Sequence, residues 1–152
     1  MKKFQIISML LIPLFIIGCG GGQGKAKMNI PELGFSMTAP AGWKLDNPRM
    51  CSKGVSTCLI IDEPLGGENF TRYAERLAKE QSSQLVLSPS RTISGCEAIE
   101  AVIEYPNAGS KAIKVYIHRG DRLIEVSFVV PIEEFPKYEP KLRKSINSIE
   151  IE

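Results

Sequence analysis

The sequence has few of the residues and motifs that catalytic and metal sites need. Its only histidine is His118, and it contains no Gly-x-Ser-x-Gly elbow, P-loop or dinucleotide-binding glycine pattern. A zinc site needs three or four converging His, Cys or carboxylate ligands, and the spacing of these residues predicts no such set. We therefore expect no metal, no cofactor and no catalytic residues, with His118 at the surface.

The chain also lacks an excess of charge of either sign. Without residues 1–18, which have the parts of a cleaved export signal, the 19 Lys and Arg fall to 17 and equal the 17 Asp and Glu. Nucleic-acid-binding domains show a clustered basic face, so we expect no nucleic-acid partner. Attachment to a membrane then has to come from a lipid rather than from a polybasic segment.

No hydrophobic run reaches the length of about 20 residues that a transmembrane helix needs. The apolar run from Phe4 to Ile17 has 14 residues, is interrupted by Pro13, and follows Lys2 and Lys3. A positive segment, a short apolar run and a small residue before the cleavage site are the parts of a secretory signal. The N-terminus is therefore predicted to be an export signal.

The end of this run, Ile16-Ile17-Gly18-Cys19, resembles the lipobox of bacterial lipoproteins. The resemblance implies that residues 1–18 are a lipoprotein signal peptide and that Cys19 carries the lipid, including palmitate-like acyl chains. An ordinary cleaved signal or an uncleaved anchor is the alternative. Gly20 follows the cysteine where an inner-membrane lipoprotein would have Asp, so we expect an envelope protein facing the periplasm, at the outer membrane rather than the inner.

After the anchor, residues 19–30 are rich in glycine and read as a flexible leash. Residues 31–152 then form a single domain, because about 120 residues can bury one core but not two. Alternation and turn residues predict a mixed α+β fold. We expect strands over 33–38, after 43, and over 57–62, 85–94, 96–105, 111–119, 122–131 and 148–152, and helices from Asn69 onward and over 139–147.

The pair of strands around Gly120-Asp121 can be predicted in register. A two-residue type II′ turn with Gly first places Ile117 opposite Ile124 and Val115 opposite Val126, so that one face is apolar throughout. The other face is polar. We expect it to be open to water and to gather the side chains Glu100, Glu104, Lys114, Tyr116 and Glu125.

Three segments together resemble the PsbP-like family. They are Phe35-Ser36-Met37-Thr38-Ala39-Pro40-Ala41-Gly42-Trp43, Ile93-Ser94-Gly95 and Lys144-Ser145-Ile146-Asn147-Ser148-Ile149. The resemblance, over about residues 33–151, implies a PsbP-like α/β/α sandwich, with an antiparallel sheet flanked by helices. Members include bacterial envelope lipoproteins such as DcrB. The resemblance implies binding to other macromolecules and no shared catalytic centre.

Besides Cys19, the chain has Cys51, Cys58 and Cys96. Disulfides form in oxidising compartments such as the periplasm, and an odd number leaves one cysteine without a partner in the chain. The six residues between Cys51 and Cys58 can form a hairpin that brings the two opposite each other, which favours a Cys51–Cys58 disulfide. Free thiols and a bridge to Cys96 are the alternatives.

Taken together, these features favour a lipid-anchored envelope protein that is not an enzyme and that binds a protein partner or stabilises an envelope assembly. Its membrane contact would run through the lipid on Cys19, and the sequence does not identify the protein partner. A small-ligand or ion-binding sensor is the first alternative, with Lys114, Tyr116 and Glu125 as its ligand face. An uncharacterised hydrolase with His118 as its base is the second.

Overall fold

The computed structural model describes residues 26–82 and 84–152. The predicted signal peptide, the predicted lipid attachment site Cys19 and most of the predicted leash lie outside these residues. The elements of the described part are β1 Lys27–Ile30, η1 Pro31–Leu33, β2 Phe35–Thr38, β3 Lys44–Asn47, β4 Met50–Lys53, β5 Ser56–Pro64, α1 Phe70–Gln81, β6 Leu85–Leu87, β7 Arg91–Ile93, β8 Cys96–Tyr105, η2 Pro106–Ala108, β9 Ser110–Arg119, β10 Arg122–Pro131, η3 Ile132–Glu134, α2 Phe135–Ile146 and β11 Glu150–Ile151.

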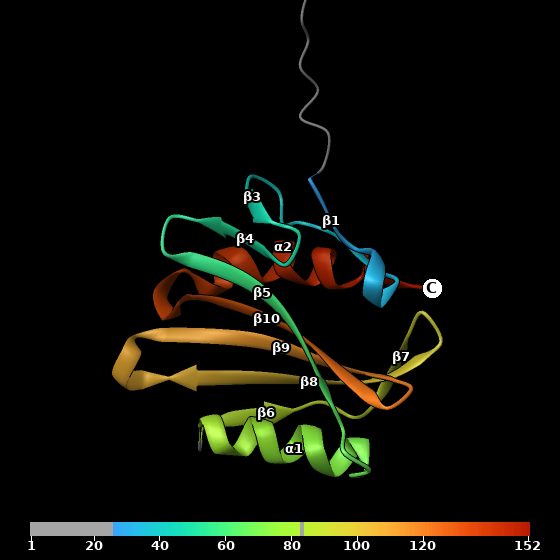
Figure 1. The fold of residues 1–152 in the computed structure, drawn as a ribbon. Coiled ribbons are helices and arrows are strands. Elements are labelled where there is room, and N and C mark those ends of the chain that lie inside the picture. Colours follow the sequence, from blue (N-terminus) through green and yellow to red (C-terminus); the bar gives the residue numbers. More distant parts are fainter. Residues whose placement is uncertain (1–25, 83) are drawn as a thin grey trace, which may run out of the picture.

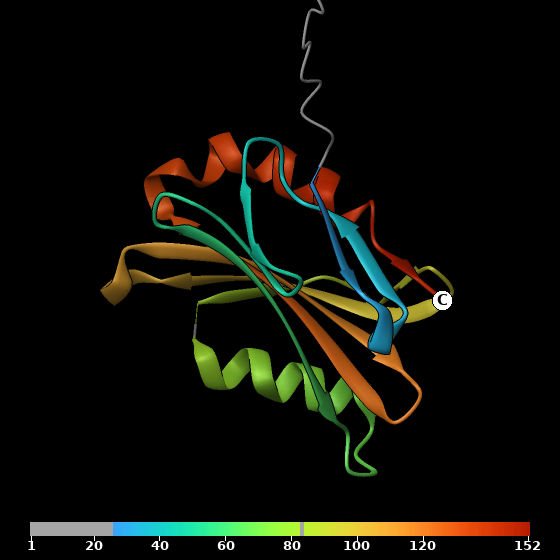
Figure 2. The same cartoon turned by 45° about the horizontal axis from the view of Figure 1, so that its top comes forward.

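The strands form two sheets. The large sheet has the order β3-β4-β5-β10-β9-β8-β6, with β7 paired to β8, and the small sheet has the order β1-β2-β11. Every strand pair is antiparallel. Helix α1 lies on one face of the large sheet, and α2 and the small sheet lie on the other (Figures 1 and 2). The structure is thus an α+β fold with an antiparallel sheet between helices, as the sequence predicts.

Two apolar cores follow from this layering. The larger lies between the large sheet, α2 and the small sheet, and contains Phe35, Trp43, Phe128 and Leu142. The smaller lies under α1, where Phe70, Ala74 and Ala78 of the helix pack against the opposite face of the sheet. Each face of the central strands is therefore buried, which explains why β9 and β10 are buried along most of their length.

The β9–β10 hairpin has the predicted register. Ile117 lies opposite Ile124 and Val115 opposite Val126, and all four side chains are fully buried. Gly120 has φ +61°, the left-handed conformation that the first central position of a type II′ turn requires. Local turn chemistry and alternation were sufficient to define this hairpin.

Helix α1 also begins where the sequence predicts. The Asn69 side chain accepts a hydrogen bond from the Arg72 backbone N–H at 3.1 Å, which caps the helix. The exposed face carries the predicted ion pairs four residues apart, Lys79 with Glu75 and Arg76 with Glu80. The periodicity of the segment therefore predicted both the buried and the solvated face.

The second helix begins earlier than residue 139, so the predicted start was wrong. Helix α2 starts at Phe135 and contains Pro140 in its interior. A proline inside a helix removes one backbone hydrogen bond. The extra turn buries Phe135 and Tyr138, which are 6% and 4% exposed, and this packing outweighs the missing bond.

The predicted leash over residues 19–30 is also too long. Lys27–Ile30 forms strand β1, and its alternate side chains Met28 and Ile30 are 0% and 1% exposed. Met28 lies opposite Met37 and Ile30 opposite Phe35 in β2. The folded part thus begins no later than Lys27, because apolar contacts with β2 order a segment whose composition alone reads as flexible.

Candidate functional site

The predicted ligand face of the sheet is not exposed to solvent. Lys114, Tyr116 and Glu125 are 8%, 0% and 4% exposed, because α1 covers this side of β8 and β9. The Lys114 ammonium group donates to the Glu125 carboxylate in a buried ion pair. The prediction of an open polar face is wrong, and the pair satisfies its own charges within the fold.

Tyr116 is the least accessible of these groups. Its hydroxyl group is buried and has no hydrogen-bond partner among the described residues. Burial raises the pKa of Tyr116, and the negative charge of Glu125 adds to this shift. The phenol is therefore held neutral in the core under α1, where it contributes packing.

The two other glutamates of the predicted face lie on the opposite side of the sheet. Ile99 is paired with Tyr116, so Glu100, the next residue of β8, faces α2. Its carboxylate accepts a hydrogen bond from Arg143 of α2 at 2.7 Å and pairs with Arg91 at 3.4 Å. Glu104 pairs with Lys111 at 2.7 Å. These carboxylates join β8 to α2, β7 and β9.

Cys51 and Cys58 lie directly opposite each other on β4 and β5, as the hairpin prediction required. Both are fully buried free thiols, so the structure does not contain the predicted Cys51–Cys58 disulfide. Burial raises the pKa of the Cys58 thiol, while a hydrogen bond from Cys58 lowers the pKa of Cys51. The buried pair packs in the larger core, and Cys96 is a half-buried free thiol.

His118 is partly exposed, with 37% of its side chain accessible. Its ring stacks on Phe70 with centroids 4.9 Å apart, and its Nε2 lies 2.9 Å from the Gly120 carbonyl oxygen. Within residues 26–82 and 84–152 there is no group of three His, Cys, Asp or Glu side chains that could hold a metal ion. The contacts of His118 are those of a residue that supports the β9–β10 turn.

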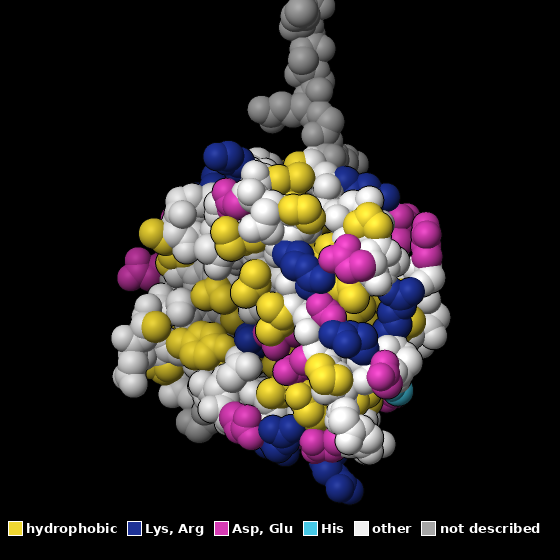
Figure 3. Space-filling view, in the orientation of Figure 1, with side chains coloured by type: hydrophobic (Ala, Val, Ile, Leu, Met, Phe, Trp, Pro, Cys, Tyr) yellow, Lys and Arg dark blue, Asp and Glu magenta, His cyan; other side chains and the backbone are white. Residues whose placement is uncertain are grey.

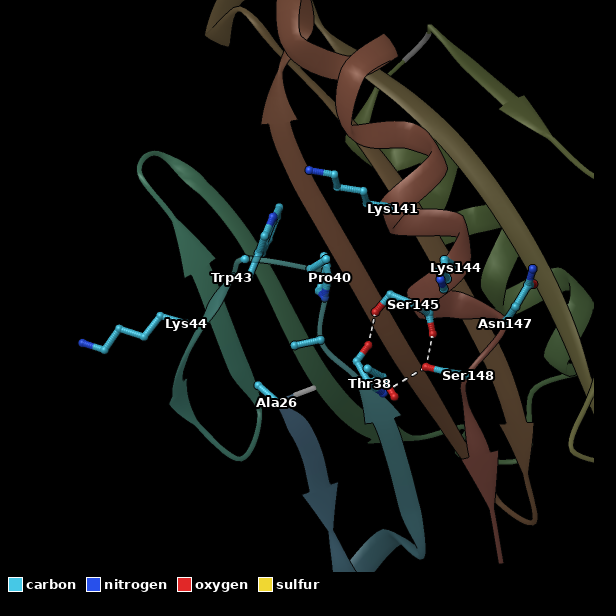
Figure 4. A pocket seen from close by; sticks show the side chains of 13 residues that line it. Ala26, Thr38, Pro40, Trp43, Lys44, Lys141, Lys144, Ser145, Asn147 and Ser148 are labelled. Atoms are coloured by element: carbon cyan, nitrogen blue, oxygen red, sulfur yellow. Dashed lines mark hydrogen bonds between the residues drawn. The ribbon is translucent and has the colours of Figure 1, made fainter. Parts of the chain in front are cut away.

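A pocket of about 770 Å³ opens between α2 and the loop joining β2 to β3 (Figure 4). The sequence predicted no site here, although most of the lining belongs to two of the segments that carry the PsbP-like resemblance, residues 35–43 and 144–149. Pockets that bind small molecules usually measure about 300–1,000 Å³. The lining residues come from three segments distant in the sequence: Ala26, Thr38, Ala39, Pro40, Ala41, Gly42, Trp43, Lys44, Lys141, Lys144, Ser145, Asn147 and Ser148.

Aromatic packing and hydrogen bonds hold the walls of this Trp43 pocket. Trp43 makes edge-to-face contacts with Phe128 and Tyr138, at centroid distances of 6.5 and 5.9 Å. The Ser145 hydroxyl group donates to the Thr38 carbonyl. The backbone N–H of Thr38 donates to the Ser148 hydroxyl group at 2.9 Å. The end of α2 is thus fastened to the end of β2, so the pocket is formed in the folded domain.

The charged side chains that line the pocket are all lysines. Lys141 extends from α2 across the pocket toward the Trp43 segment, Lys144 lies one turn further along, and Lys44 points away (Figure 4). The lining residues include no carboxylate. None of the ion pairs between described residues involves Lys141 or Lys144. The rim therefore offers two exposed, unneutralised positive charges above an apolar wall.

The lysines continue along the exposed side of α2. Lys137, Lys141 and Lys144 follow each other at i, i+4 and i+7, which places them on one side of the helix. This basic stripe corrects the inference from net charge that the domain has no basic face. The spacing was visible in the sequence, but a prediction that starts the helix at residue 139 leaves Lys137 out of it.

A second exposed feature lies on β5. Leu59 and Ile61 are 43% and 42% exposed, and they lie beside Ser127 and Glu125 of β10 on the face that α1 covers only in part. Apolar side chains gather along the path of β5 on the face shown in Figure 3. This β5 patch is distinct from the Trp43 pocket, since the pocket is built from α2, β2 and the following loop.

Solved structures identify the fold. The solution structure of the cyanobacterial PsbP, CyanoP, from Synechocystis sp. PCC 6803 superposes with a TM-score of 0.60 and 10% identity, covering 90% of this chain and 99% of that chain. The chain has a PsbP-like fold. At this identity the likeness concerns the fold alone, so the sequence resemblance is confirmed only to that extent.

Two further solved structures superpose on this chain. PA94 of Pseudomonas aeruginosa gives a TM-score of 0.51 at 15% identity, over 81% of this chain and 94% of that one. A Bacteroides thetaiotaomicron protein gives 0.52 at 18% identity, over 86% of this chain and 49% of that one. No model of a known protein family matches the chain, and no curated protein matches it.

The helices of the described part, α1 and α2, are too short and too polar to cross a membrane. The residues predicted to form the export signal were outside this search.

Proposed function

We propose that the protein is a lipid-anchored, non-enzymatic protein of the bacterial envelope whose PsbP-like domain binds an anionic partner molecule at the Trp43 pocket. The observation that carries the binding role is the pocket itself: a wall of apolar groups with Lys141 and Lys144 at its rim and no carboxylate in its lining. Such a site attracts negative charge but holds no pair of groups suited to general acid and base catalysis.

The anchor is argued from the lipobox-like segment ending in Cys19. Seven positions separate Cys19 from Ala26, which lines the pocket, and a fully extended chain of this length spans at most about 25 Å. An acylated Cys19 therefore keeps the pocket near the membrane surface. Labelling of cells with a radioactive fatty acid tests this step: the wild-type chain should incorporate label and Cys19→Ser should not. An unlabelled wild-type chain would refute the anchor.

The binding role is tested by crosslinking in cells. A photoreactive amino acid at Ala41, which is exposed at the pocket, should capture the partner, whereas the same group at Gln84, far from the pocket, should not. The double variant Lys141→Gln/Lys144→Gln removes two rim charges without disturbing the buried face of α2 and should abolish the adduct. Equal capture at both positions, or capture independent of the two lysines, would count against the pocket as the binding site.

A second candidate binding surface is favoured by the β5 patch. Exposed apolar side chains that lie together often mark protein contacts, and Leu59 and Ile61 lie side by side on one face of β5. A protein partner of an envelope assembly would dock there. Leu59→Ser with Ile61→Thr should then reduce recovery of that partner without affecting an adduct formed at Ala41, and unchanged recovery would eliminate this surface.

A further inference from the structure

The lining of the Trp43 pocket defines the chemistry of its ligand more closely. Its wall is made of methyl, proline and indole groups, from Ala39, Pro40, Ala41 and Trp43. These groups can bury apolar surface but offer few hydrogen bonds. The two lysines stand on one side, where α2 forms the rim (Figure 4). A molecule with an apolar tail and an anionic end matches both parts.

We infer that the pocket binds one acyl chain of an anionic membrane phospholipid, whose phosphate group lies between Lys141 and Lys144. This inference rests on the proposed function, because the lipid anchor brings the pocket to the bilayer and the pocket is its binding site. Of the anionic amphiphiles that the chemistry admits, a phospholipid is favoured over a free fatty acid since the bilayer is the source that lies within reach of the anchor.

Two observations on the domain support this orientation. Ala26, the first described residue and the one nearest to the anchor, lines the pocket. The basic stripe of Lys137, Lys141 and Lys144 lies on the exposed side of the helix that forms the rim. The point where the chain leads toward the anchor, the pocket and the stripe therefore belong to one face, and basic residues near an anionic membrane surface strengthen attachment to it.

The pocket contains its own reporter, because Trp43 is the only tryptophan of the chain. The mature lipidated chain, purified from membranes, is incorporated into phosphatidylcholine vesicles that contain phosphatidylglycerol. In one preparation the phosphatidylglycerol carries bromine atoms on its acyl chains. In the other, an equal amount of phosphatidylcholine carries them. Bromine quenches tryptophan fluorescence only at close range, so the measurement reports which lipid enters the pocket.

We expect brominated phosphatidylglycerol to quench Trp43 more strongly than brominated phosphatidylcholine. In Lys141→Gln/Lys144→Gln, the fraction of brominated phosphatidylglycerol needed for half-maximal quenching should rise roughly fivefold for each lysine removed. The control is Arg72→Gln/Lys79→Gln, which removes the same charge from exposed positions of α1 on the other face of the sheet. It should leave the quenching unchanged.

Equal quenching by the two lipids, an absence of quenching, or equal effects of the two double variants would overturn the inference. So would quenching by an added brominated fatty acid when brominated phosphatidylglycerol has no effect, because the ligand would then be a free acid. Flotation of the vesicles separates this failure from that of the anchor. A chain that floats without selective quenching refutes only the lipid site, whereas a chain that does not float refutes the anchor and with it the lipid site.

Discussion

The buried ion pair between Lys114 and Glu125 allows a sharp test of how the domain is built. Lys114 and Glu125 are 8% and 4% exposed, and they lie between α1 and the large sheet. Removing one partner of a buried pair leaves the other charge uncompensated and typically costs about 3–5 kcal/mol. Because Lys114 retains some contact with water, we expect the lower end for Glu125→Gln and for Lys114→Met, about 3 kcal/mol each.

The double variant Lys114→Met/Glu125→Leu should behave differently from the sum of its parts. It removes both charges and fills the same space with apolar groups, a replacement that is often neutral or stabilising. We therefore expect its free energy of unfolding to lie within about 1 kcal/mol of the wild-type value. Each of the two charges would then stabilise the domain only by compensating the other buried charge.

Urea unfolding followed by Trp43 fluorescence measures these differences. With a slope of about 2 kcal/mol per molar urea, typical of small domains, each single variant should unfold at a urea concentration about 1.5 M lower. Glu75→Gln is the control, because it breaks an exposed ion pair on α1 and should shift the midpoint by no more than a few tenths of a molar. Single variants that behave like this control, or a double variant as unstable as the two losses combined, would refute the reasoning.

Three further predictions concern other parts of the fold. A thiol reagent should modify Cys96 in the native domain and reach Cys51 and Cys58 only after unfolding, which mass spectrometry of labelled peptides would show; equal labelling of all three would contradict their burial. The hydrogen bond from Arg49 holds the pKa of Asp62 below its usual range. The ionised Asp62 carboxylate therefore stabilises the domain at any pH above its pKa in the unfolded chain. This stabilisation is lost as the pH falls through the lower pKa that Asp62 has in the folded domain. Asp62→Asn should make acid unfolding less steep in that range, and an unchanged pH profile would eliminate this contribution. Gly34→Ala should destabilise the domain by about 1–2 kcal/mol because φ is +54°, and an unchanged melting temperature would contradict the strain.

Most of the large sheet could be predicted from the sequence. The strand over 96–105 matches β8, the extended segment over 85–94 contains β6 and β7, and the β9–β10 register is correct to the residue. These features depend on alternation and on turn residues close in the sequence. The start of α2 was missed because Pro140 resembles a first-turn proline, while the contacts that extend the helix, from Phe135 and Tyr138, lie in the core.

The predicted ligand face failed for a different reason. The alternation of apolar and polar residues was assigned correctly within β8 and within β9. In the sheet, however, the apolar side chains of β8 lie on the same face as the polar side chains of β9. Ile99 lies beside Tyr116, and Ala101 lies beside Lys114. Which side chains of the two strands share a face depends on the register of β8 against β9 across η2. The alternation within either strand does not specify that register. The side chains that seemed to form one polar face therefore divide between α1 and α2.

The sequence by itself determined the α+β class, the β9–β10 hairpin, the start of α1 and the lipobox-like segment, because each depends on residues close together in the chain. Only the tertiary structure decided that β1 is ordered, that Lys114 and Glu125 are covered, and that a pocket exists. Apart from Ala26, the walls of that pocket come from residues 38–44 and 141–148, which lie far apart in the sequence. Their meeting depends on α2 packing across the larger core, a contact between distant segments that no local pattern specifies.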